Sequence, residues 1–167
     1  QASSTTSATQ LGVFITDTIR HANIVGGVAG ASGCAVTVGG NVTGSSLLGR
    51  AFVSREVSGT LTGICFRNTS SSSTSATATQ IIANVQSTSP SAQSLIGVAG
   101  PTSSPFAMND CAIEVDISSS SPGTAQGILM EHAVTLHGVT ISANVPASEA
   151  TAMGIDIGCV SERRRKT

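Results

Sequence analysis

The sequence predicts an all-β fold, a right-handed parallel β-helix (β-solenoid) of about six irregular coils. Apolar residues alternate with polar ones at period two, and helical periodicity is nearly absent. The hydrophobic fraction of 40% consists mainly of Ala, Val and Ile, which suit thin β layers. A short glycine-led phrase recurs along the chain, as in repeat proteins that bury each unit against its neighbours. The same short strands also allow an alternative, an antiparallel β-sandwich or jelly roll.

The recurring phrase is a Ser/Thr/Ala lead-in, a glycine and then a short apolar strand. It occurs at 9–15, 46–53, 93–99, 125–130 and 152–157. We equate the glycines of successive units, which are Gly12, Gly27, Gly49, Gly63, Gly97, Gly127 and Gly154. The steps between them range from 14 to 34 residues, so the units have drifted apart. We expect each glycine to mark a bend or a close approach that a Cβ atom would block.

Alternating strands follow the glycine-led ones. In the clearest of them, 111–117, the apolar residues face one side and Glu114 and Asp116 the other. Similar alternation predicts strands at 34–38, 81–85 and 134–141, bounded by turn-forming Gly, Ser, Asn and Pro clusters. We expect Cys34 and Cys111 to take the same position in their units.

The segment 24–44, IVGGVAGASGCAVTVGGNVTG, resembles the GLUG-type repeats of secreted surface proteins. Those repeats open with Gly-Gly, two apolar residues and Gly, continue through a polar turn, and close on a strand ending in V-x-G. Partial copies stand at 55–63 and 95–100, and the resemblance covers about half of the chain. It implies a β-helical segment of a cell-surface or secreted, adhesin-like protein, and it brings no catalytic residues.

Length and charge indicate one domain with a short tail. Residues 1–161 form the predicted repeat domain, with four arginines against eight acidic residues. Residues 162–167 form a basic C-terminal tail. The mildly acidic body has no Tyr or Trp and no basic stripe, which excludes a typical nucleic-acid binder. No apolar run approaches the length of about 20 residues that a membrane span needs.

Cysteines and sequons favour an extracellular or cell-surface location. Cys34, Cys65, Cys111 and Cys159 could form two disulfides in any of three pairings. Asn41 and Asn68 head N-glycosylation sequons in turn-like stretches, so a secreted glycoprotein is expected.

Glu114 and Asp116 are the best candidates for chemistry. At positions i and i+2 of a strand they lie about 7 Å apart on one face, which suits acid–base work or a calcium ion. An enzyme acting on polysaccharides would add an arginine to them, Arg50, Arg55 or Arg67. Two solvated side chains that discourage edge aggregation are the favoured interpretation. No phosphate-binding loop, nucleophile elbow or metal-ligand spacing is present, so we expect no enzyme, no cofactor and no metal.

The predicted function is therefore that of a structural or interaction module. We expect it to bind protein partners, like copies in a homo-oligomer, fibre or layer, or surface glycans. The less favoured alternatives are the polysaccharide-acting enzyme and an ice-binding protein. The second alternative is suggested by the T-x-T pairs Thr16/Thr18, Thr60/Thr62 and Thr77/Thr79.

Overall fold

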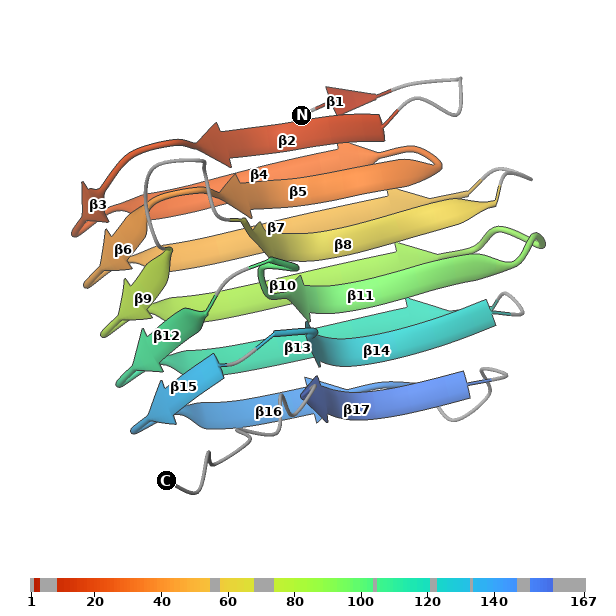
Figure 1. The fold of residues 1–167 in the computed structure, drawn as a ribbon. Helices are drawn as coiled ribbons and strands as arrows, with labels where there is room; N and C mark the ends of the chain where they lie inside the picture. Colours follow the sequence, from red (N-terminus) through yellow and green to blue (C-terminus); the bar gives the residue numbers. More distant parts are fainter. Residues whose placement is uncertain are drawn as a thin grey trace.

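The computed structural model describes residues 2–3, 9–54, 58–67, 74–103, 105–120, 123–132, 134–146 and 151–157. These residues form three parallel β-sheets and no helix (Figure 1). Every strand pair among them is parallel, so the predicted β-solenoid is confirmed and the antiparallel alternative is wrong. The basic tail, 162–167, lies outside the described residues.

Each sheet takes one strand from every turn of the chain. Sheet A consists, in order, of β1 (Ala2–Ser3), β4 (Asn23–Ala29), β7 (Ser46–Val53), β10 (Gln80–Ser87), β13 (Ala112–Ser119) and β16 (Thr140–Asn144). Sheet B consists of β2 (Thr9–Ile15), β5 (Ser32–Val38), β8 (Gly59–Phe66), β11 (Gln93–Ala99), β14 (Gly123–Met130) and β17 (Thr151–Ile157). Sheet C consists of β3 (Ile19–Arg20), β6 (Asn41–Thr43), β9 (Ser75–Thr77), β12 (Phe106–Asn109) and β15 (Val134–His137).

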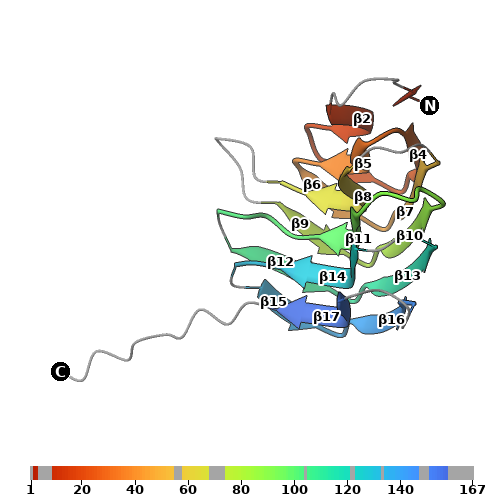
Figure 2. The same ribbon diagram turned by 90° about the vertical axis from the view of Figure 1, so that its right-hand side faces the viewer.

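The turns stack along one axis (Figure 2). Four of them are complete: β4–β6, β7–β9, β10–β12 and β13–β15. The first turn consists of β1, β2 and β3, of which β1 and β3 are only two residues long. After the four complete turns, β16 and β17 form the last, incomplete turn. The structure therefore has about four complete turns with a shorter turn at each end, whereas the sequence predicts about six coils.

Columns of equivalent apolar side chains fill the interior. In sheet A, register places Leu47, Ile81 and Ile113 in one such column, and all three are buried. In sheet C, the buried Met108 belongs to a similar column. The rings of Phe66 and Phe106 are also in contact in the interior, with 4.7 Å between their centroids. Because each strand repeats the register of the strand below it, the core continues from turn to turn.

The alternation predicted for 111–117 is confirmed in β13. Ile113, Val115 and Ile117 are buried, and Glu114 and Asp116 are exposed. The simple alternation predicted for 34–38 is wrong, because β5 buries residues on both of its faces.

A column of glycines lets sheets A and B approach each other closely. Gly12, Gly63, Gly97, Gly127 and Gly154 occupy equivalent positions in sheet B, with Ala35 in the one turn that lacks a glycine. A Cβ atom on Gly97 would lie 2.2 Å from Val115 Cγ1 of sheet A, and one on Gly63 would lie 2.7 Å from Ala83 Cβ. Both distances are too short for real atoms, so the layers exclude a side chain here. The expected close approach at the glycine is confirmed for Gly12, Gly63, Gly97 and Gly127, whereas a Cβ atom on Gly154 would meet nothing within 4 Å.

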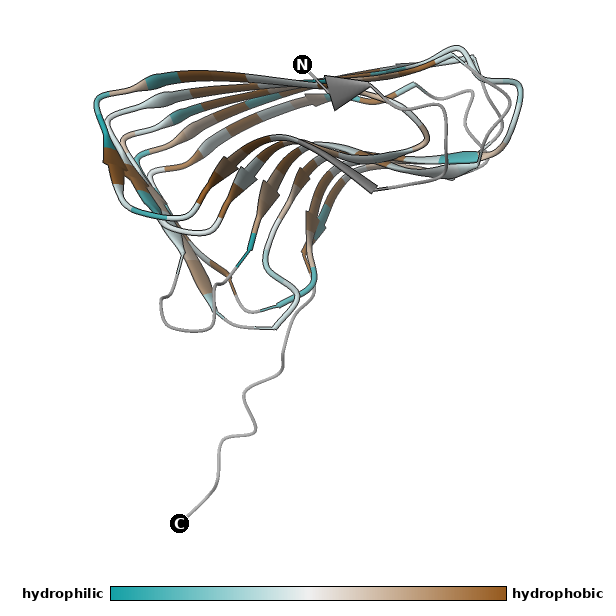
Figure 3. Cartoon of the chain, turned by 90° about the horizontal axis from the view of Figure 1, so that it is seen from above, coloured by the Kyte–Doolittle hydropathy of each residue, from teal (hydrophilic) through white to brown (hydrophobic). Residues whose placement is uncertain are grey.

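Sheet B also bends at this glycine column. The regular pairing in each strand is interrupted at the glycine, and the inward-facing pattern shifts there by one residue. In β8 the interior is lined by Leu61 and Gly63 before the shift, and by Ile64 and Phe66 after it. Viewed down the stack, sheets A and B run side by side and then diverge, and sheet C closes the gap (Figure 3).

Three of the residue equivalences predicted from the sequence are wrong. Gly49 belongs to sheet A, paired with Gly26 and facing Gly63 across the interior. Gly27 lies in an outward-facing row, opposite Arg50. Cys34 belongs to sheet B, whereas Cys111 stands at the corner that leads into sheet A. The same glycine-led phrase is thus used in two sheets, because both must be thin where they meet.

At the corner from sheet C to sheet A, each of five turns has one residue in the left-handed backbone conformation. These residues, with φ between 48° and 63°, are His21, Gly44, Ala78, Asp110 and Gly138. The first four donate their backbone N–H to a carbonyl of the next turn at 2.8–3.0 Å. Beside them, the buried Ser45, Thr79 and Cys111 each donate to the carbonyl two residues earlier, at 2.9, 2.8 and 3.3 Å. The corner is therefore a hydrogen-bonded ladder that runs along the stack.

This corner explains why the strand predicted at 134–141 is wrong. Gly138 takes a left-handed conformation in its middle, with φ of 63°. The chain turns there, and the segment becomes β15 in sheet C and β16 in sheet A.

Replacing Gly97 with alanine should destabilise the fold by about 3 kcal/mol, because its Cβ would overlap Val115 and the Gly127 carbonyl oxygen. Gly154→Ala is the matched control: it belongs to the same column, but its Cβ would meet nothing within 4 Å. It should change the stability by about 0.5 kcal/mol or less. Urea denaturation of both variants measures the difference, and equal losses would contradict the packing assigned to the column.

Replacing Ala78 with glycine should stabilise the fold by roughly 0.5–1 kcal/mol. The left-handed conformation strains an alanine, and glycine relieves that strain at the cost of some unfolded-state entropy. Ala107→Gly, in the regular strand β12 of the adjoining sheet C, should instead destabilise the fold by a similar amount. Thermal denaturation tests the pair, and destabilisation by both substitutions would refute the strained corner.

Candidate functional site

The outer face of sheet A presents side chains in aligned rows. Its middle row runs across five strands and consists of Gly27, Arg50, Asn84, Asp116 and Asn144. Apart from Gly27, which has no side chain, these residues are exposed. Neighbouring strands of a sheet lie about 4.8 Å apart, so the row offers one polar group per strand at a nearly constant spacing.

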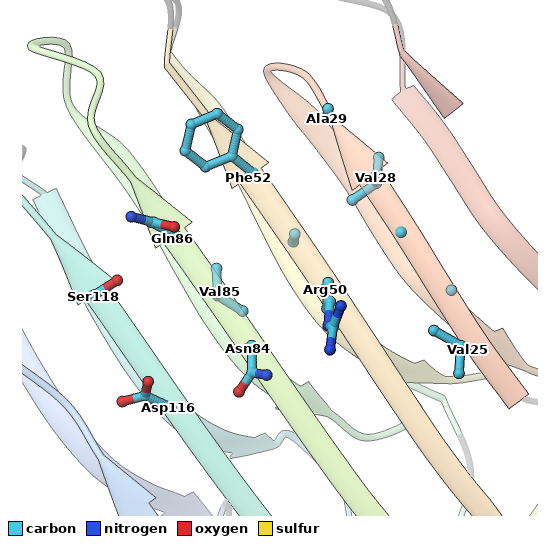
Figure 4. Close-up of a pocket in the computed structure, with 13 residues that line it drawn as sticks. Val25, Val28, Ala29, Arg50, Phe52, Asn84, Val85, Gln86, Asp116 and Ser118 are labelled. Atoms are coloured by element: carbon cyan, nitrogen blue, oxygen red, sulfur yellow. The ribbon is translucent and has the colours of Figure 1, made fainter. Parts of the chain in front are cut away.

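A groove of about 710 Å³, here called the sheet A groove, lies over the first four residues of this row, from Gly27 to Asp116. Thirteen residues of β4, β7, β10 and β13 line it (Figure 4). The groove is an open hollow on the sheet surface, and Gly27 contributes to it because it leaves space beside Arg50.

Apolar side chains stand on both sides of the polar row. Phe52 is 39% exposed and lies next to Gln86 and Ser118 in one flanking row. Val25, on the other side, is 63% exposed. The groove therefore combines hydrogen-bonding groups at its centre with apolar contacts at its edges, the usual composition of a site for an amphipathic ligand.

The predicted carboxylate pair stands at one end of the groove. Glu114 and Asp116 are both exposed on β13, and Asp116 lines the groove. Asn144 Nδ2 donates a hydrogen bond to Asp116 Oδ1 at 2.8 Å, which fixes that carboxylate. Asn84, between Arg50 and Asp116 in the row, could not be assigned to a site from the sequence, because only the register reveals the row.

Of the two candidate arginines that the structure describes, one shares this face. Arg50 lies in the same row as Asp116, two strands away, which is about 10 Å. Arg67 follows β8 of sheet B, where its Nη2 lies 3.9 Å from Cys34 Sγ. Arg55 lies outside the described residues. The geometry thus groups Arg50 with Asp116 as two ends of one surface.

Among the described cysteines there is one disulfide, and it spans the bend of sheet B. Cys34 of β5 and Cys65 of β8 are joined, with 6.2 Å between their Cα atoms. Cys34 precedes the glycine column and Cys65 follows it one turn later, so the bond ties two successive turns across the bend. A disulfide is typical of proteins from oxidising environments, as in the extracellular space.

The prediction of a disulfide at Cys111 is wrong. Cys111 is a free thiol, buried in the corner ladder, where burial raises its pKa although hydrogen bonds with Thr79 and Asn109 act in the opposite direction. A buried thiol with a raised pKa is a poor nucleophile, so this residue is structural. Cys159 lies outside the described residues.

The first predicted glycosylation site lies in a strand, whereas the sequence suggested a turn. Asn41 is the first residue of β6 and is half-buried, and its Oδ1 accepts a hydrogen bond from Ser75 Oγ at 2.9 Å. Glycosylation at Asn41 stays a prediction, and Asn68 lies outside the described residues.

The threonine pairs do not form a flat array in the described part of the chain. Thr62 and Thr79 are buried, and Thr77 and Thr79 stand on either side of a corner. Sheet B instead carries one row of hydroxyl residues, which the sequence did not reveal: Ser32, Thr60, Ser94, Thr124 and Thr151.

The last turn exposes side chains that are buried in the turns before it. Ile155 of β17 is 50% exposed, whereas Ile128, its equivalent in β14, is 1% exposed. Leu136 of β15 and Ile157 of β17 are also exposed, although their equivalents Met108 and Met130 are buried. β15, β16 and β17 end the strand order of their sheets, so this turn presents an apolar, strand-edge surface.

Among the described residues, no three His, Cys, Asp or Glu side chains lie together as metal ligands, and no helix has the length and hydropathy needed to cross a membrane.

Comparison of the chain with protein-family models, curated proteins and solved structures found no match. The resemblance to GLUG-type repeats therefore stays a prediction.

Replacing both Cys34 and Cys65 with alanine should lower the free energy of unfolding by about 3.5 kcal/mol. The bond spans 31 residues, and closing a loop of that length restricts the unfolded chain by about this amount in the chain-entropy model. Chemical denaturation of the oxidised protein and of the double variant gives the difference. Cys111→Ala serves as the control, because reductant should still destabilise that variant; insensitivity to reductant would contradict the assigned bond.

Proposed function

We propose that this chain is a structural or interaction module of an extracellular or cell-surface protein, one that associates with like copies or with protein partners and catalyses no reaction. The single observation that carries the proposal is the exposed apolar surface of the last turn. A β-solenoid buries each turn against the next, and Leu136, Ile155 and Ile157 are exposed in the last described turn although their equivalents in the turn before it are buried.

The chemistry of this surface favours another β-layer as its occupant. Its strand edges offer backbone N–H and C=O groups, and its apolar side chains continue the columns of the interior. Contact between opposite ends of two copies would be heterologous and would leave a new end free. Such contacts lead to a fibre or a layer.

The remaining features support a role in binding without turnover. The disulfide favours an oxidising compartment. The carboxylates at 114 and 116 stand on an open face, about 10 Å from the one described arginine in their row. The threonine pairs that suggested ice binding are partly buried and not aligned. We therefore favour neither alternative over the interaction module.

The protein should associate reversibly as its concentration rises, and Ile155→Lys should abolish that association. A lysine at this position places a charge on the stacking surface, and it should leave the fold intact because half of the side chain is exposed. Sedimentation velocity over a hundredfold range of concentration measures the effect. Val25→Lys, on the outer face of sheet A, is the matched control and should associate as the wild type does. A wild-type protein that stays monomeric, or association that survives Ile155→Lys, would contradict the proposal.

A further inference from the structure

The sheet A groove has the geometry of a site for an extended ligand. It crosses four strands, β4, β7, β10 and β13, and so runs along the solenoid axis. Its middle row presents one hydrogen-bonding residue per strand from β7 to β13: Arg50, Asn84 and Asp116. A repeating set of groups at about 4.8 Å matches a linear chain of similar units better than a compact molecule.

The side chains of the groove match hydroxyl groups. Arg50 offers donors only, Asp116 offers acceptors only, and Asn84 and Gln86 offer both. A sugar hydroxyl both donates and accepts, so it can satisfy any of these groups. Asn144 holds Asp116 in place through the 2.8 Å hydrogen bond, which reduces the ordering cost on binding.

Phe52 adds an apolar platform beside the polar row. Its ring is 39% exposed at the edge of the groove, and Phe52 lies two residues after Arg50 in β7, on the same face of the strand. The faces of a pyranose ring carry C–H groups, which pack on aromatic rings while the hydroxyls at the rim make hydrogen bonds. This pairing of an aromatic edge with a polar row distinguishes the groove from a protein-docking surface, whose centre is apolar.

The charges in the groove favour a neutral ligand. Arg50 is balanced by Asp116 within the row, and Glu114 adds a second carboxylate beside Asp116. A polysaccharide with a carboxylate or sulfate on each unit would meet repulsion at that end of the groove. We propose that the sheet A groove binds a neutral, hydroxyl-rich oligosaccharide chain lying along the solenoid axis. This inference goes beyond the proposed association through the last turn and uses a different surface.

Affinity electrophoresis in native gels containing a soluble mannan or a soluble β-glucan tests the proposal, with polygalacturonate as the acidic comparison. The wild type should be retarded by a neutral polysaccharide and not by the acidic one. Phe52→Ala and Asn84→Ala should each weaken binding about tenfold. Phe14→Ala and Asn23→Ala, exposed residues outside the groove, are the matched controls and should bind as the wild type does.

Three results would overturn the proposal: no retardation by either neutral polysaccharide, stronger binding to polygalacturonate, or equal binding by the groove variants and their controls. Circular dichroism of each variant confirms that its fold is intact. The outcome is separate from that of the proposed association, because groove variants should sediment as the wild type does. A monomeric protein that binds the glycan would refute the association alone.

Discussion

The fold depends on the close approach of sheets A and B along the glycine column of sheet B. At Gly63, Gly97 and Gly127 the opposite sheet lies so near that a single Cβ atom would overlap it. The residues that face this column in sheet A are themselves small or β-branched: Gly49, Ala83, Val115 and Ala143. The same column is where sheet B bends and its inward-facing pattern shifts. One steric constraint, repeated at Gly63, Gly97 and Gly127, thus sets both the thickness and the cross-section of the middle of the stack.

Because the turns stack in register, their equivalent residues form continuous surfaces along the molecule. Because each turn keeps the register of the one before it, an outward-facing residue forms a row with its equivalents, and the sheet A groove is one product of this order. The last turn is another product, since the columns of the interior emerge there as exposed apolar side chains. Both candidate surfaces therefore result from the repetition of similar turns along one axis, and both consist of strand residues.

Much of the fold could be predicted from the sequence. Period-two alternation in 111–117, the small apolar residues and the recurring glycines indicated a parallel β-solenoid and placed glycine at sites of close approach. The assignment of glycines to one column partly failed, because sheets A and B must both be thin where they meet and so use similar sequences. The break at Gly138 was missed, since a left-handed corner leaves alternation on both sides unchanged.

The candidate site was harder to predict for a related reason. Asp116 and Arg50 were recognised as candidates, but Asn84 and Phe52 carry no motif. They become part of a site only when the register places β7, β10 and β13 side by side. Likewise, spacing alone could not choose among the cysteine pairings, because the partner of Cys34 depends on the bend that carries it toward Cys65.

The most direct test of this account is a measurement of proton distances across the glycine column by nuclear Overhauser spectroscopy. The account predicts strong cross-peaks from the Gly97 Hα protons to a Val115 methyl group, and from the Gly63 Hα protons to the Ala83 methyl group, because the equivalent Cβ positions lie within 2.2 and 2.7 Å of those carbons. Absence of these cross-peaks in the folded protein, with the strand pairing of sheet B still observed, would contradict the claim that this contact defines the fold.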